Sequence, residues 1–144
     1  MKLGKLLTST VVVTVIMFLT DWLWYGMLMK DSMTPLPNAR PEMDFTWMIL
    51  GMLIYGFAFS YIFAQGRGTG SAVGEGARFG FWATLLAWIP MGFVWYGLVS
   101  TMPLSEYLTN DVFRLVQMMI IGIAVAYTMG MQGDRGKSAT GGDG

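Results

Sequence analysis

The chain has 144 residues, and its 9 lysines and arginines balance its 9 aspartates and glutamates. It contains no cysteine and no histidine, which excludes disulfides, thiolate metal sites and imidazole acid–base chemistry. A net charge of zero gives no basic surface for nucleic acid. A serine nucleophile would need a lysine base, and no lysine lies within the apolar segments described next. We therefore expect no enzymatic activity and no catalytic, cofactor or metal site.

Four apolar segments account for most of the chain, at residues 6–29, 45–65, 79–102 and 112–131. A helix of about 20 apolar residues crosses a bilayer core of about 30 Å, and it satisfies its backbone polar groups internally. The sequence thus predicts an all-α membrane protein with one four-helix transmembrane domain over residues 1–132. The glycine-rich residues 133–144 are typical of a flexible cytoplasmic tail. No small-x-small cleavage site follows the first segment, which predicts a retained helix.

Asp21 is the acidic residue that lies well inside an apolar segment. A carboxylate in mid-membrane costs about 3 kcal/mol, and such residues often mark ion paths. The alternative is a structural carboxylate near the interface, hydrogen-bonded to a tyrosine or serine. Its neighbours at helical spacing, Phe18, Trp24 and Tyr25, offer a hydroxyl but no cation. We favour the structural interpretation.

Aromatic residues gather near the ends of the first and third segments. Amphipathic rings commonly form belts at the membrane interface, whereas a stacked pigment or quinone is the alternative. We expect an outer belt of Trp22, Trp24, Tyr25, Trp95 and Tyr96.

The connecting segments differ in character. Three prolines in residues 30–44 indicate an extended outer loop. Residues 66–76 are rich in glycine, but a phosphate-binding loop needs a preceding strand, so we expect a flexible connection. Within the third segment, Pro90 cannot donate to the carbonyl of Leu86, which predicts a kink.

Small residues recur at a spacing of four in the second and fourth segments. Such rows let helix backbones approach closely in a membrane. We expect these two helices to make the closest helix contacts, although a row could also serve another subunit. The predicted packing residues are Gly56, Ser60 and Ala64, and Gly122, Ala126 and Gly130.

The sequence also contains an internal similarity. Trp24-Tyr25-Gly26 recurs as Trp95-Tyr96-Gly97, and the second small-residue row follows the first by 66 positions. This pattern predicts two repeated antiparallel hairpins, related by an axis near the membrane normal.

Cationic residues set the expected orientation, because cytoplasmic loops carry an excess of lysine and arginine. The N-terminus, second loop and tail hold six cations, and the opposite side holds three, Lys30, Arg40 and Arg114. We therefore expect a multi-pass membrane protein with both termini cytoplasmic.

The pattern resembles a family of small bacterial four-helix membrane proteins known only as a domain of unknown function. The matching parts are the run Asp21-Trp22-Leu23-Trp24-Tyr25-Gly26, residues 55–66 and 74–80, and the final helix. The resemblance implies the fold and a place in the bacterial inner membrane, and it carries no catalytic residue with it.

Two functions fit these observations. The first is a non-enzymatic accessory or structural subunit that packs against other membrane subunits, copies of itself, lipids or hydrophobic cofactors. The alternative is a small proton-coupled transporter, acting as an oligomer, with Asp21 as the coupling carboxylate. The scarcity of polar residues in the apolar segments favours the subunit.

Overall fold

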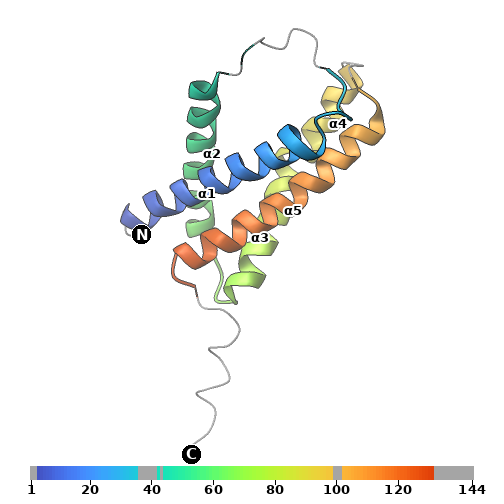
Figure 1. Ribbon diagram of the computed structural model, residues 1–144. Coiled ribbons are helices and arrows are strands. Elements are labelled where there is room, and N and C mark those ends of the chain that lie inside the picture. Colours follow the sequence, from blue (N-terminus) through green and yellow to red (C-terminus); the bar gives the residue numbers. More distant parts are fainter. Residues whose placement is uncertain (1–2, 36–41, 43, 99–101, 132–144) are drawn as a thin grey trace, which may run out of the picture.

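A computed structural model describes residues 3–35, 42, 44–98 and 102–131. All regular structure in these residues is helical, and Figure 1 shows its arrangement. The first helix, α1, continues directly into a turn of π-helix, η1. The elements are α1 (Leu3–Leu23), η1 (Trp24–Leu28), α2 (Phe45–Gly66), α3 (Ala72–Ala87), α4 (Ile89–Leu98) and α5 (Leu104–Thr128).

Four helical stretches are long and apolar enough to cross a membrane. They are Leu3–Leu28, Phe45–Gly66, Ala72–Leu98 and Leu104–Thr128. The prediction of an all-α, multi-pass membrane protein is therefore confirmed. The predicted tail, residues 133–144, lies outside the described residues.

Local capping explains where α3 begins. The Ser71 side chain accepts a hydrogen bond from the backbone N–H of Gly74 at 3.1 Å, a typical N-cap interaction. The helix thus starts at Ala72, seven residues earlier than expected, and Gly74 and Gly76 belong to it. Only residues 67–71 connect α2 to α3, so most of the expected flexible connection is helical.

The end of α5 is set by a left-handed glycine. Gly130 has φ +84°, and its N–H donates to Tyr127 O at 2.9 Å, while the N–H of Met131 donates to Ala126 O at 3.1 Å. These two bonds form a Schellman motif, which terminates a helix. Gly130 therefore ends α5 and does not extend its row of packing residues.

The third membrane helix is interrupted as predicted. α3 ends at Ala87 and α4 begins at Ile89, with Trp88 between them. Since Pro90 has no N–H, the carbonyl of Leu86 loses its usual helical donor. The hydrogen bonds resume with Gly92, whose N–H donates to Trp88 O at 2.9 Å.

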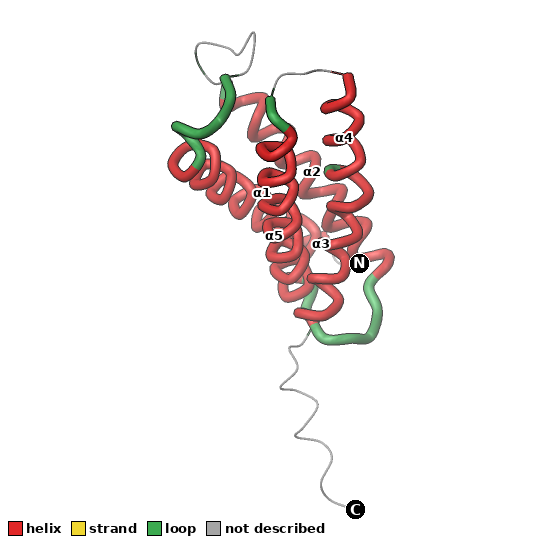
Figure 2. The backbone as a smooth tube through the Cα atoms, turned by 90° about the vertical axis from the view of Figure 1, so that its right-hand side faces the viewer, coloured by secondary structure: helices red, strands yellow, loops and turns green. Residues whose placement is uncertain are grey.

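The helices pack in two pairs, α1 with α2 and α3 with α5. Contacts between α1 and α5 join the two pairs. Figure 1 shows α1 crossing in front of α2, and α5 running along α3. Figure 2 shows the same elements from the side. The core lies where α1, α2, α3 and α5 meet, and its fully buried apolar side chains are Val13, Phe63, Ala72, Met118, Ile121, Val125 and Ala126.

The closest backbone approach is between α3 and α5. A Cβ atom at Gly122 would lie 2.1 Å from Gly76 O, and one at Gly80 would lie 2.1 Å from Met118 O. Such contacts are impossible for any larger residue, so the two backbones touch directly. The α3 side of this contact is a row of small buried residues at a spacing of four, Ala72, Gly76, Gly80 and Thr84.

The small-residue row of α2 packs against α1 instead. A Cβ atom at Gly56 would lie 3.0 Å from Thr10 O, and Ser60 Oγ donates to Ser9 Oγ at 2.9 Å. Ala64 is partly buried against the core. The expectation that the second and fourth membrane helices make the closest contacts therefore holds for α5 but not for α2, because α3 carries a tighter row of its own. The repeat between the two hairpins stays a prediction.

Candidate functional site

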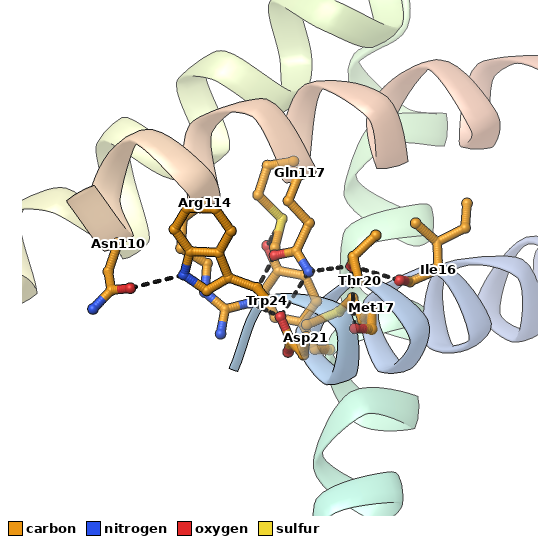
Figure 3. A network of polar contacts seen from close by, with 10 residues as sticks. Ile16, Met17, Thr20, Asp21, Trp24, Asn110, Arg114 and Gln117 are labelled. Carbon is orange, nitrogen blue, oxygen red and sulfur yellow. Dashed lines mark hydrogen bonds and ion pairs between the residues drawn. The ribbon is translucent and has the colours of Figure 1, made fainter. Parts of the chain in front are cut away.

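A polar cluster joins α1 to α5 inside the apolar part of the fold. Asp21 lies in the last turn of α1, and Arg114 and Gln117 lie one turn apart on α5. Arg114 Nη1 donates to Asp21 Oδ1 at 2.8 Å and to Gln117 Oε1 at 2.6 Å. Figure 3 shows these side chains pointing toward one another across the two helices.

Gln117 connects this ion pair to the backbone of α1. Its side chain is 2% exposed, and its Nε2 donates to Asp21 Oδ1 at 2.8 Å and to Thr20 Oγ1 at 2.6 Å. Thr20 Oγ1 in turn donates to Ile16 O at 2.6 Å. The polar groups form one connected network, which removes the penalty of burying them separately.

Aromatic rings surround the guanidinium. The Cζ atom of Arg114 lies 4.7 Å from the Trp88 ring centroid and 5.6 Å from the centroids of Tyr25 and Phe113. Arg114 is thus stabilised by a carboxylate on one side and by ring faces on others. The break at Trp88 between α3 and α4 matters here, because it places that ring against the cation.

The π-helical turn orients the side chains of Trp24 and Tyr25 toward α5. The Trp24 ring stacks on Phe113 with centroids 4.5 Å apart and planes 4° apart, and Trp24 Nε1 donates to Asn110 Oδ1 at 2.9 Å. Tyr25 meets Phe113 edge-on at 5.9 Å. π-Helical turns occur frequently at functional sites, where the wider turn redirects side chains.

A cavity of about 580 Å³ lies beside the ion pair, between α1, η1 and the first turns of α2. Its volume falls within the range of small-molecule sites. Charged residues line part of it, and apolar or aromatic side chains line the rest. The lining residues are Phe18, Asp21, Trp22, Tyr25, Gly26, Lys30, Phe45, Met48, Met52 and Arg114.

The five aromatics expected in one belt separate into two groups. Trp24 and Tyr25 turn inward onto Phe113. Trp22 and Trp95 are largely exposed, as an interfacial belt requires, and Tyr96 is exposed with its ring edge-on to Tyr107 at 5.3 Å. Trp24 and Tyr25 thus contact the bundle while the other three rings face outward, and the belt itself stays a prediction.

Asp21 has a partner of a different kind from the one expected. The sequence predicts a tyrosine or serine hydroxyl as the donor to Asp21, whereas the structure shows the guanidinium of Arg114 and the amide of Gln117. The predicted fourth segment, residues 112–131, puts Arg114 near the outer boundary of the membrane. In the structure α5 begins at Leu104, so Arg114 lies ten residues, or about 15 Å, along the helix.

The sequence carries a signal for part of this site. Arg114 and Gln117 are three residues apart in a segment that is otherwise largely apolar, with Asn110 one turn before them. Residues three or four apart share one face of a helix, so this spacing indicates a polar stripe. The stripe does not identify Asp21 as its partner, because that contact spans 93 residues.

No family model, curated protein or solved structure matches the chain. The resemblance to the four-helix family therefore stays an expectation.

Proposed function

We propose that this protein is a non-enzymatic membrane subunit that packs laterally against other integral membrane subunits or a second copy of itself, within the lipid bilayer. The observation that carries this proposal is the exposure of two half-helices. Seven consecutive residues at the start of α2, from Phe45 to Gly51, are exposed, as are six consecutive residues of α4, from Phe93 to Leu98.

Runs of this length cover the whole circumference of a helix, since one turn has 3.6 residues. A helix at the edge of a membrane bundle ordinarily exposes one face to lipid and packs the other. Every residue of these two segments stays exposed within the described part of the chain, although Phe45 contacts Phe18 and Tyr96 contacts Tyr107. Both lie at the same end of the molecule, the upper end in Figure 1, so one assembly could cover both.

Membrane helices associate through close packing and not through a hydrophobic driving force. Unpacked helices therefore favour a partner whose helices fill the empty sides. Direct metal ligation by imidazole or thiolate is unavailable to this chain, so any hydrophobic cofactor in the assembly would be contacted through packing.

Site-specific photo-crosslinking tests the proposal. A photoreactive residue at Trp47 in α2 or Trp95 in α4, which are 66% and 55% exposed, should capture protein in native membranes. The matched control is Leu7, which is 52% exposed but adjoins the buried Leu6, and we expect it to capture mainly lipid. Capture of lipid alone at all three positions would contradict a partner subunit.

We propose further that the protein lies in the bacterial inner membrane with both termini cytoplasmic. Support comes from two cations at one end of the bundle, since Lys5 Nζ and Arg67 Nη1 both donate to Met129 O, at 3.0 and 3.2 Å. The start of α1, the end of α2 and the end of α5 thus share one side. An excess of cations favours the cytoplasm for that side.

The second candidate is a small proton-coupled transporter, and one observation favours it. Asp21 lines the cavity of about 580 Å³ and is an intramembrane carboxylate. Against it, Asp21 Oδ1 accepts from both Arg114 and Gln117, which fits a fixed structural carboxylate. A solute flux in proteoliposomes that follows a pH gradient and disappears in an Asp21→Asn variant that still folds would favour the transporter.

A further inference from the structure

The cavity beside the ion pair carries an excess of positive charge. Two cations, Arg114 and Lys30, and one carboxylate, Asp21, line it. Asp21 is neutralised by Arg114 at 2.8 Å, so the ammonium of Lys30 is the excess charge. Of the nearby acidic groups, Asp31 does not line the cavity, and Asp44 accepts from Thr46 N as the N-cap of α2.

Arg114 still has unused donors that can reach a ligand. A guanidinium carries five N–H donors in a planar fork. Two of its hydrogen bonds use Nη1, and the guanidinium also hydrogen-bonds the Tyr25 hydroxyl, so part of the five-donor fork is left for a ligand. In an apolar environment an unbonded charged donor is costly. The oxygens of a phosphate or carboxylate fit such a fork in a bidentate manner.

Lys30 lies at the rim of the cavity, in the turn that follows η1. Its side chain is exposed and makes no hydrogen bond or ion pair with the described residues. The end of a membrane helix is where lipid headgroups lie, and a lysine near the surface attracts anionic lipids. The rim is therefore positioned to meet a headgroup that enters from the bilayer.

The remaining walls suit a hydrocarbon chain. Phe18 and Trp22 of α1 and Phe45, Met48 and Met52 of α2 present apolar surface to the cavity. Methionine side chains are flexible and adapt to irregular ligands such as acyl chains. A cavity lined by both cations and apolar side chains matches an anionic amphiphile.

We propose that this cavity binds an anionic membrane phospholipid, with its phosphate near Lys30 and the remaining donors of Arg114 and an acyl chain against Phe18, Phe45, Met48 and Met52. The site needs no partner subunit, but Phe45 and Met48 also belong to the exposed stretch of α2 that the proposed assembly would cover, so the test below includes a partner helix as an outcome.

Native mass spectrometry of the full chain in mild detergent tests the site. The purified protein is titrated with phosphatidylglycerol, and separately with phosphatidylcholine of the same acyl chains. We expect stronger retention of phosphatidylglycerol. In Lys30→Gln its apparent affinity should fall about fivefold, the effect of removing one surface cation near an anionic lipid.

Two further variants separate charge from shape. Arg78→Gln removes a cation that is 62% exposed and does not line this cavity, and it should bind as the wild type does. Met48→Trp fills the apolar part of the cavity without a change of charge and should also weaken retention. An unchanged melting temperature shows that each variant is folded.

Three results would overturn the proposal. One is equal retention of both lipids with no effect of Lys30→Gln. Another is displacement of phosphatidylglycerol by equimolar inorganic phosphate, which would indicate a site for a free anion. The third is capture of a protein and not a lipid by a photoreactive residue at Met48, which would assign the cavity to a partner helix.

Discussion

Arg114 Nη1 lies 2.8 Å from Asp21 Oδ1, although 93 residues separate the two. The side chains are 13% and 15% exposed, so water screens the pair little. The contact fixes the last turn of α1 against the middle of α5, and it positions the guanidinium beside the cavity. Removing one member of such a pair leaves an unpaired charge in an apolar environment, which is far more costly than removing both.

Replacement of one partner should therefore destabilise the fold strongly. We expect Arg114→Met to lower the free energy of unfolding by about 3 kcal/mol or more, since Asp21 then loses its cation. Asp21→Asn should have a similar effect, because Arg114 would then lack a counter-charge. Reversible unfolding in mixed detergent micelles, followed by tryptophan fluorescence, measures both.

The double variant Asp21→Asn/Arg114→Met is the control for this prediction. It removes both charges, so its cost should be well below the sum of the two single costs. Strict additivity of the two single effects would show that the pair is not coupled.

Close packing of glycines should give a graded response to added methyl groups. A Cβ atom at Gly122 would lie 2.1 Å from Gly76 O, and one at Gly56 would lie 3.0 Å from Thr10 O, whereas Gly51 has no atom within 4 Å. We expect Gly122→Ala to cost about 3 kcal/mol and Gly56→Ala less. Gly51→Ala should be neutral or stabilising by about 0.5 kcal/mol, because alanine favours helix.

Melting temperatures of the three variants in one detergent provide the ranking. A cost for Gly51→Ala that equals the cost for Gly122→Ala would rule out the contact between α3 and α5 as the closest approach. Leucine at Gly56 or Gly122 should also be worse than leucine at Ala83 or Ala87, of which Ala83 is partly buried and Ala87 exposed.

The buried carboxylate of Glu106 should hold the segment after η1 in place. Glu106 is 7% exposed, and it accepts from Thr34 N at 3.1 Å and from Thr34 Oγ1 at 2.8 Å. Hydrogen bonds to a charged group contribute about 1.5–3 kcal/mol. In Glu106→Ala the amide of Thr34 should therefore exchange its hydrogen at least about tenfold faster.

Hydrogen–deuterium exchange with mass spectrometry of the peptide that contains Thr34 provides this measurement. The control is Thr109→Val on the same helix, where an exposed hydroxyl donates only to Ser105 O. Exchange that is unchanged in Glu106→Ala would mean that this carboxylate does not restrain the segment.

The proposed orientation predicts which positions are accessible from outside the cell. The chain has no cysteine, so each introduced thiol is unique. Ser32→Cys, in the exposed turn after η1, should react with a membrane-impermeant maleimide in intact cells. Ser138→Cys should react only after lysis. The opposite pattern would place both termini outside.

The sequence alone was sufficient for the number and type of helices, because hydropathy is a local property that each segment carries by itself. It also predicted the interruption near Pro90, since a missing N–H acts within one turn. Helix boundaries were less accurate. α5 begins eight residues before the expected position because Leu104–Asp111 is too polar to count as apolar yet continues the helix.

Only the tertiary structure decided which helices touch. A row of small residues permits a close approach but does not select the partner, so Gly122 meets α3 and Gly56 meets α1. The same holds for the polar cluster. Asp21 and Arg114 were each visible in the sequence, but their pairing depends on the rotation and relative height of α1 and α5. Those quantities follow from the packing of all the helices together, and no single segment encodes them.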